Sequence, residues 1–354
     1  MREFVVVGAG PAGSHFARRA ADAGHDVLVL ERGTIGRPLA CSGHVSRDLW
    51  EFVEGAREDL LQHEIGEARF HLDEQPEDGY PFRVSGSISD VIDRVKLDQT
   101  LAERAQAAGA DVRDQQHVIS VDEGPDSVTV TARGPDGIEE FHPRIVVGSD
   151  GPRSRVRREL GLSPPSRLLH GVFGYESTPD HDPGVDVHLT TPGLFAWRIP
   201  RGAAGCEYGI AAPPGGDVRT RFHRHLRAHE VDPSAIETYA GGIPIGPPPT
   251  VTSERGLLIG DAAGQTKPFT GGGIVYGLTC AEHAATTVDP WEPDSLDRYE
   301  RAWRRDIGPD IRLGEVIRQA YRLPTPIRRL GLRLFSGSID VEMDRPASLI
   351  PGRG

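Results

Sequence analysis

The sequence has few cysteines and no long apolar run. Its 354 residues include three cysteines, Cys41, Cys206 and Cys280, and none forms a CxxC pair. This count argues against a disulfide framework and against a zinc site made of cysteines alone, and it is typical of a reducing cytoplasm. No apolar stretch reaches the 18 residues that a membrane span requires, and the N-terminal run is too short for a signal peptide. We therefore expect a cytoplasmic protein.

Lysine is nearly missing as well. Lys96 and Lys267 are the two lysines, which leaves 38 arginines among the 40 basic residues. The 52 acidic residues give a formal net charge of −12, and no basic stripe dominates, so we expect no nucleic-acid partner. The fractions of hydrophobic (37%) and charged (26%) residues are ordinary for a folded globular protein. The length predicts two or three lobes.

The first 32 residues predict a complete βαβ unit. Phe4–Val7 and Val27–Leu30 have the pattern of buried strands, and residues 11–23 that of a helix. The turn between the first strand and the helix is a GxGxxG fingerprint made of Gly8, Gly10 and Gly13, with Ala12 inside it. Such a turn lets the backbone approach a pyrophosphate at the helix N-terminus. Glu31, followed by Arg32, ends the second strand where a carboxylate accepts ribose hydroxyls, so the unit predicts a bound dinucleotide, NAD or FAD.

The rest of the chain predicts an α/β protein with an inserted sheet lobe. The elements expected beside the βαβ unit are helices over 90–108 and 274–287, strands over 112–121, 145–148 and 257–259, and a hairpin about 134–137. Residues 33–86 have an irregular pattern. Residues 161–250 alternate and are rich in proline, which is typical of an antiparallel sheet, and they include one helix over 218–229. Residues 293–354 are mostly helical in pattern.

Two later motifs favour FAD over NAD. Asp150 follows the strand at 145–148, and Gly260 and Asp261 follow the strand at 257–259. With the GxGxxG turn, these motifs resemble in order and spacing the flavoproteins of the p-hydroxybenzoate hydroxylase fold. The resemblance implies that Asp261 holds the ribityl hydroxyls and that the next helix faces the pyrimidine end of the flavin. A helix N-terminus stabilises the negative charge of a reduced flavin, and the turn that leads to it contains Pro268, Gly272, Gly273 and Ile274.

Within that fold the chain resembles the geranylgeranyl reductase family over nearly its whole length, including archaeal enzymes that saturate isoprenoid chains of membrane lipids. Arg94, with Asp98 four residues on, looks like the family's RxxxD arginine, which braces the flavin. The alternative is a surface ion pair of an exposed helix. Val118 matches the position whose backbone meets the adenine, and the alternative is an ordinary strand valine.

Cys41 lies in a segment similar to the family's cysteine-glycine loop beside the flavin. Ser42 and His44 stand where glycines are commoner in that loop. Cys41, His44 and the flavin itself are the candidate proton sources for catalysis. The alternative for Cys41 is a small core residue.

A second segment is similar to the family's YxWxFP signature, which lines the lipid pocket. Here it contains Phe195, Trp197 and Pro200, and Phe195 and Ile199 replace the family's tyrosine and phenylalanine. The apolar bulk of a hydrocarbon pocket is kept, whereas a phenol that could donate a proton is lost. The alternative is a buried strand without a pocket.

The resemblance implies an FAD-dependent reductase that saturates C=C bonds of a geranylgeranyl or other polyprenyl chain in membrane lipid biosynthesis. It would take electrons from ferredoxin, NAD(P)H or another carrier, and we expect a monomer. An aromatic hydroxylase of the same fold and a flavin- or lipid-binding protein without turnover are the alternatives. We assign 1–70, 87–160 and 251–290 to an FAD-binding domain, 71–86 and 161–250 to a substrate domain, and 291–354 to a helical region.

Histidines and the C-terminal arginines complete the sequence predictions. None of the 14 histidines forms an HExxH motif or a His/Cys cluster at metal-ligand spacing, so we expect no metal site. His223 and His225 are predicted to lie on the solvated face of a helix. Residues 326–335 place Ile327, Leu330 and Leu334 on one helical face and arginines off it. This pattern is typical of a helix docked on the protein's own core, which we expect, or of peripheral contact with the inner face of an anionic membrane.

Overall fold

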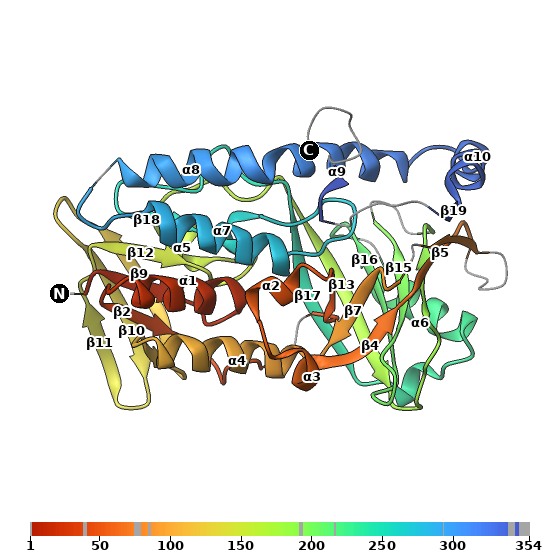
Figure 1. The fold of residues 1–354 in the computed structure, drawn as a ribbon, viewed down its shortest axis with the longest axis horizontal. Helices are drawn as coiled ribbons and strands as arrows, with labels where there is room; N and C mark the ends of the chain where they lie inside the picture. The colour runs from red at the N-terminus through yellow and green to blue at the C-terminus, as the bar shows by residue number, and fades with distance from the viewer. Residues whose placement is uncertain are drawn as a thin grey trace.

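The structure is a computed structural model that describes residues 2–37, 41–73, 79–83, 86–190, 194–215, 217–292, 294–338 and 344–346. Figure 1 shows two lobes side by side, with the N-terminal helices and a parallel sheet in one and a large twisted sheet in the other. Among the described residues, no helix combines the length and the apolar character that crossing a membrane requires.

The first lobe is built on a five-stranded parallel sheet in the order β18-β12-β1-β2-β8. Its strands are β1 Phe4–Val7, β2 Val27–Leu30, β8 Asp111–Arg113, β12 Ile145–Gly148 and β18 Gly256–Leu258. The strands are short and β-branched, and β1, β2 and β12 are buried along their whole length, as expected for a sheet covered on both faces. The helices α1 Pro11–Asp22, α4 Arg94–Ala107 and α7 Ile274–Thr287 pack side by side on it.

Smaller elements complete this lobe. A three-stranded antiparallel sheet contains β9 His117–Glu123, β10 Val128–Gly134 and β11 Gly137–Phe141, and α5 Arg155–Glu159 follows β12. The C-terminal helix α8 Ser295–Asp306 packs on α7, with Tyr299 and Trp303 fully buried in the main core. The predicted helical region at 291–354 therefore contributes to the core of the first lobe.

The second lobe is an eight-stranded sheet in the order β17-β13-β16-β15-β14-β5-β6-β19. Its strands are β5 Glu67–His71, β6 Tyr80–Arg83, β13 Arg167–Glu176, β14 Gly184–His188, β15 Ala196–Pro200, β16 Cys206–Ala212, β17 Thr238–Ile245 and β19 Gly337–Ser338. Neighbouring strands are antiparallel except for β5 with β14 and β6 with β19. Helix α6 Val218–Ala228 covers one face through Phe222 and Leu226, followed by the short 3-10 helix η2 Pro233–Ala235.

A small sheet joins the two lobes. It pairs β7 Ser89–Ile92 with β3 His44–Val45 and β4 Leu61–Ile65, and the one-turn helices α2 Leu49–Phe52 and α3 Arg57–Leu60 lie between β3 and β4. Leu49, Leu60 and Ile92 from these elements form a core with Leu97 of α4 and Leu278 of α7. Next to this core, Gly43 of the Cys41 loop accepts a backbone hydrogen bond from Ile92 and lies against Arg94 at the start of α4.

The predicted α/β fold class is confirmed, and three local predictions were wrong. The helix expected over 90–108 begins at Arg94, because Ser89–Ile92 forms β7 and the Asp93 carboxylate caps the helix by accepting from the Lys96 N–H. The strand expected over 112–121 is two strands in different sheets, separated near Gln115, which has a positive φ of 53°. The region 33–86, expected to be irregular, contributes strands to two sheets. The proposed domain boundaries stay a prediction.

Helix α10 Thr325–Phe335 also departs from its expected packing. Ile327, Leu330 and Leu334 are 52%, 59% and 70% exposed, so the apolar face does not dock on the described core. The inward side instead carries Arg328, whose guanidinium donates to the Leu189 carbonyl oxygen at 2.6 Å. Helix α9 Gly308–Ala320 connects α10 to α8.

Candidate functional site

The GxGxxG turn is held by very close backbone packing. Gly8 has φ +101°, and a side chain at Gly13 would place its Cβ 2.1 Å from the Gly8 carbonyl oxygen. Gly10 is different, because a Cβ there would meet nothing within 4 Å. The turn is therefore packed tightly toward the sheet and open at Gly10, the N-cap of α1. An open backbone beside a helix N-terminus is the arrangement that accepts a pyrophosphate.

Glu31 lies beside this turn, as the sequence predicts. Its carboxylate accepts from the Ala9 N–H at 2.8 Å and from the Gly33 N–H at 3.1 Å. A carboxylate has about four lone-pair positions, so Glu31 keeps acceptor capacity for hydroxyls. Arg32 is exposed.

The second glycine motif meets the first. A side chain at Gly260 would place its Cβ 3.1 Å from the Cβ of Ala12, so the late loop touches the start of α1. At Gly273, the N-cap of α7, a Cβ would lie 2.8 Å from Asp261 Oδ1. Burial raises the pKa of Asp261 to about 6, and the Arg94 cation opposes that rise. Asp261, Arg94 and the N-terminus of α7 are thus brought together from three distant segments.

The turn before α7 contains the remaining predicted residues of this motif. Pro268 is buried against Gly314 of α9, and Gly272 lies against the side chain of Lys267, which is ion-paired with Asp344. Ile274 packs on the core that joins the lobes.

Arg94 forms a buried ion pair, so the alternative of an exposed surface pair is wrong. Its Nη2 lies 2.8 Å from Asp98 Oδ2, with the two side chains 9% and 11% exposed. The Arg94 Nε is buried without a partner. Burial raises the pKa of Asp98, and the Arg94 cation opposes this rise. A buried donor without a partner at this point fits a polar group of a cofactor.

The Cys41 loop lies close to Arg94. A Cβ at Gly43 would lie 3.1 Å from Arg94 Cγ, and burial raises the pKa of the Cys41 thiol while the Arg94 cation opposes this. His44 Nε2 lies 2.6 Å from Ser89 Oγ, and burial together with the Lys267 charge lowers the pKa of His44 to about 4. At neutral pH the Cys41 thiol therefore holds a proton, whereas His44 is uncharged. Ser42 Oγ accepts from the His44 N–H at 3.3 Å.

Two predicted cofactor residues also have structural roles. Asp150 Oδ2 accepts from the N–H groups of Arg155 and Val156 at 2.6 and 3.2 Å, while its Oδ1 is buried without a partner. The Val118 side chain is buried in the core of the first lobe, so its backbone is the part that a ligand could reach.

Two of the three predicted pocket residues, Phe195 and Trp197, lie on one face of the large sheet and form an apolar wall, whereas Pro200 pairs with Cys206 on the other face, so its predicted place in this wall was wrong. Phe195 packs in an apolar cluster that includes Leu194, and partly buried Ile243 and Tyr321 pack against this cluster. Trp197 donates from Nε1 to Glu207 Oε1 at 2.8 Å. Pro200 is buried at the end of β15.

The sequence analysis did not identify the polar group behind this wall. Glu207 is fully buried, and burial raises its pKa to about 7, with the Arg201 cation opposing the rise. Arg201 also donates to the Ser42 carbonyl oxygen, so it connects the wall to the Cys41 loop. The Tyr175 ring lies 5.0 Å from the Arg201 guanidinium. A single sequence does not reveal that a charged strand residue such as Glu207 is buried and paired. The alternation of apolar and polar residues indicates which face of the sheet a side chain is on, but not which residue it contacts.

These residues fit FAD. Gly10 offers an open backbone for the pyrophosphate, and Glu31 offers an acceptor for the ribose hydroxyls. Asp261 and the N-terminus of α7 lie side by side and offer a carboxylate and backbone N–H groups to the flavin end. Unpartnered buried atoms of Arg94 and Asp150 lie in the same motifs. The donors and acceptors match a dinucleotide with a polar flavin end.

The comparisons with known proteins agree with this fit. A family profile described as an FAD binding domain matches residues 2–173. The chain is 33% identical to digeranylgeranylglycerophospholipid reductase 2 of Methanopyrus kandleri, over 86% of this chain and 83% of the relative. It is 28% identical to the digeranylgeranylglycerophospholipid reductase of Methanosarcina mazei, over 90% and 84% of the two chains.

Solved structures show the same fold. A geranylgeranyl bacteriochlorophyll reductase-like protein of Thermoplasma acidophilum superposes with a TM-score of 0.88 at 22% identity, covering 99% of this chain and 96% of that one. The p-nitrophenol 4-monooxygenase of Pseudomonas putida superposes with a TM-score of 0.73 at 18% identity, covering 95% and 93%. Fold and site together define an FAD-dependent oxidoreductase. The chain belongs to the family of the digeranylgeranylglycerophospholipid reductases.

Replacing Gly10 tests the assignment of the cofactor turn. Gly10→Ala keeps an allowed backbone, since φ is −70°, and its methyl enters open space. We expect the protein to fold normally but to bind FAD about tenfold or more weakly. The measurement is a titration of flavin-free protein with FAD, followed by flavin fluorescence. Gly331→Ala, in open space on α10, is the matched control. Equal FAD affinity in both variants would contradict the assignment.

Proposed function

We propose that the protein reduces C=C bonds of a geranylgeranyl or related polyprenyl chain. The observation that carries this proposal is the contact between the apolar wall and the turn before α7. A side chain at Gly271 would place its Cβ 3.1 Å from Ile243 Cγ2 and 3.7 Å from Leu194 Cδ2. An apolar surface beside the flavin end of the cofactor motifs suits a hydrocarbon. The printed names of the relatives support the same substrate class.

The residues of this protein position the prenyl chain and protonate one carbon of its double bond. Bound FAD, reduced by an external donor, supplies the hydride for one alkene carbon. An isolated alkene has no carbonyl to polarise, so Phe195, Trp197 and their neighbours orient the chain and exclude water. The proton for the other carbon comes from a group that is protonated at neutral pH. Cys41 meets that condition, because burial raises its pKa. The electron donor, ferredoxin, NAD(P)H or another carrier, and the monomeric state stay predictions.

Mass spectrometry of lipids tests both the activity and the role of Cys41. In cells that make an unsaturated prenyl lipid, the protein is expected to add two mass units per reduced bond. Cys41→Ala is expected to bind FAD normally and to lower alkene reduction by about 100-fold, as loss of a proton donor does. Cys206→Ala, in β16 on the far face of the sheet, is the control. Unchanged masses with the wild-type protein would refute the activity, and a gain of 16 units would indicate hydroxylation. Full activity of Cys41→Ala would refute only the role of the thiol.

Glu207 is expected to give the reaction its pH dependence. Its pKa is raised from the ordinary value of 4.5 to about 7, so the carboxyl is protonated below that pH and loses its proton above it. If the neutral acid resupplies protons to the site, turnover falls as pH rises through about 7. Glu207→Gln is expected to remove this limb from the kcat profile of dithionite-reduced enzyme. Glu176→Gln, on neighbouring β13, is expected to keep it. A limb that persists in Glu207→Gln would assign it to another group.

We further propose that α10 rests on an anionic membrane surface. Its exposed residues Ile327, Leu330 and Leu334 stand beside exposed Arg329 and Arg333. A short helix with apolar and basic exposed sides is suited to the boundary between headgroups and acyl chains. Such contact would let the enzyme take a lipid from the bilayer without a spanning segment.

Co-sedimentation with vesicles tests this contact. Each arginine near an anionic surface contributes about 1 kcal/mol, so Arg329→Glu with Arg333→Glu is expected to weaken binding to phosphatidylglycerol vesicles by about tenfold or more. Arg301→Glu with Arg305→Glu changes the same charge on the exposed side of α8 and serves as the control. Equal binding by the two double variants would overturn the proposal.

A further inference from the structure

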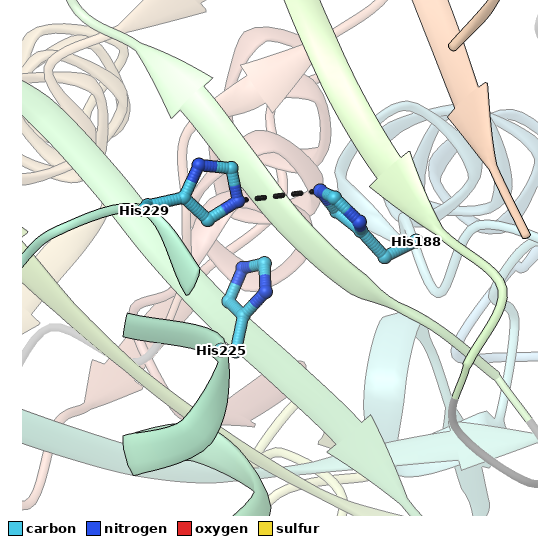
Figure 2. A group of neighbouring side chains, drawn as sticks. All are labelled: His188, His225 and His229. Carbon is cyan, nitrogen blue, oxygen red and sulfur yellow. Dashed lines mark hydrogen bonds between the residues drawn. The ribbon is translucent and has the colours of Figure 1, made fainter. Parts of the chain in front are cut away.

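Three histidines gather on the face of the large sheet that is turned away from Trp197 and Glu207. His188 ends β14, and His225 and His229 lie four residues apart on α6 and at its C-terminal end (Figure 2). His225 is 2% exposed, so the predicted placement of His225 on a solvated helix face was wrong. His188 is fully buried and His229 is half-buried.

The three rings have the spacing of a metal site. One nitrogen from each ring can be chosen so that all three lie within 4.8 Å of one another. His188 Nε2 and His229 Nε2 are 3.3 Å apart. Two ligands of a tetrahedral zinc ion, at Zn–N distances of about 2.0–2.1 Å, are separated by about 3.3 Å. The His188–His229 pair therefore has the separation of two zinc ligands already, and the His225 ring points toward the same space (Figure 2).

Backbone carbonyls select the tautomers that metal binding needs. His188 Nδ1 lies 3.0 Å from the Asp73 carbonyl oxygen, and His225 Nε2 lies 2.9 Å from the Trp197 carbonyl oxygen. A carbonyl can only accept, so these two nitrogens carry the protons. The lone pairs are left on His188 Nε2, which faces His229, and on His225 Nδ1. A ligating histidine is commonly oriented in this way through its other nitrogen.

His225 supplies the observation that points to a ligand. Its Nδ1 is buried and has no hydrogen-bond partner. A hydrogen bond from His229 to His188 satisfies that pair but leaves His225 Nδ1 unpaired, and a buried acceptor without a partner is destabilising. An ion bound by all three nitrogens would remove this deficit.

The charges around the cluster also suit a cation. Burial lowers the pKa values of His188 and His225 to about 4 and that of His229 to about 3, so the rings are neutral, as ligands must be. An ion-pair network lies beside the histidines. It contains two arginines, Arg69 and Arg198, and three aspartates, Asp180, Asp182 and Asp186. Its formal charge of −1 favours a positive ion in the adjoining space.

We propose that His188, His225 and His229 bind one divalent transition-metal ion, with zinc as the best match in geometry. Three imidazole nitrogens suit zinc, copper or nickel and do not suit magnesium or calcium. Three protein ligands leave a fourth position of a tetrahedral ion, which would hold water. The ion would join α6 to the end of β14 and so fasten the helix that covers the back of the substrate sheet. The site lies across the sheet from the proposed pocket, so it does not depend on the proposed activity.

Metal titration of the untagged, FAD-loaded protein tests this site. We expect calorimetry to give one zinc ion per chain, and Co²⁺ to show the visible bands of a tetrahedral ion at longer wavelengths than the flavin absorption. His229→Ala is expected to weaken zinc binding by about tenfold or more and to abolish the Co²⁺ bands. His223→Ala, on the same helix but outside the cluster, is expected to retain both.

Thermal unfolding keeps the test independent of folding defects. His229→Ala removes the hydrogen bond to buried His188 and is expected to unfold somewhat below the metal-free wild type, so the zinc-induced shift of each protein is measured against its own metal-free form. Saturating zinc is expected to raise the unfolding temperature of wild type and His223→Ala but not of His229→Ala. Absence of stoichiometric zinc binding by the wild type would overturn the proposal. Equal zinc affinity in wild type and His229→Ala would overturn it as well.

Discussion

The structure depends on one close contact, in which the start of α1 meets the late glycine loop. The Ala12 methyl lies between Gly260 and Gly277, where an added Cβ would be 3.1 and 3.3 Å away, respectively. No larger side chain fits in this space, since protein interiors are close-packed. The contact aligns the N-termini of α1 and α7, although their residues are more than 260 positions apart in the sequence. Pyrophosphate and flavin ends of one cofactor can be held together only while this spacing is kept.

Buried charge is the second constraint on the site. Arg94 lies near Asp98, Asp261 and Cys41, and it opposes the rise that burial imposes on the pKa of each of these groups. A single cation thus serves three groups, because a buried acid is costly unless a cation or a hydrogen bond compensates it. The placement of Arg94 at the start of α4 follows from the Asp93 cap and from β7, which ends just before it. Local helix capping therefore sets the electrostatics of the cofactor site.

Sequence reasoning succeeded where a pattern is local and failed where partners are distant. The strands Phe4–Val7 and Ile145–Gly148 and the helix Ile274–Thr287 lie as predicted, because apolar runs and glycine turns mark them directly. Most of the strand Ser89–Ile92 was predicted as part of the following helix, because a run of four mixed apolar and polar residues shows neither the periodicity of a strand nor that of a helix. Glu207 and the histidine cluster were missed for a different reason. The contacts that reveal their roles come from other elements. Trp197 and Arg201 bind the Glu207 carboxylate, and the Asp73 carbonyl oxygen accepts from His188.

The parallel pairing of β5 with β14 has a consequence for how the chain is made. Strand β5 can pair with β14 only after a further 117 residues have been synthesised, since Glu67 pairs with Gly184. In the other lobe, β12 cannot gain its neighbour β18 until residue 256 has emerged. One edge of β5 therefore stays open until residue 184 has been synthesised, and one edge of β12 until residue 256. Long-range pairings of this kind slow folding and expose strand edges, so the unpaired edge of β12 is open to aggregation until β18 has been synthesised.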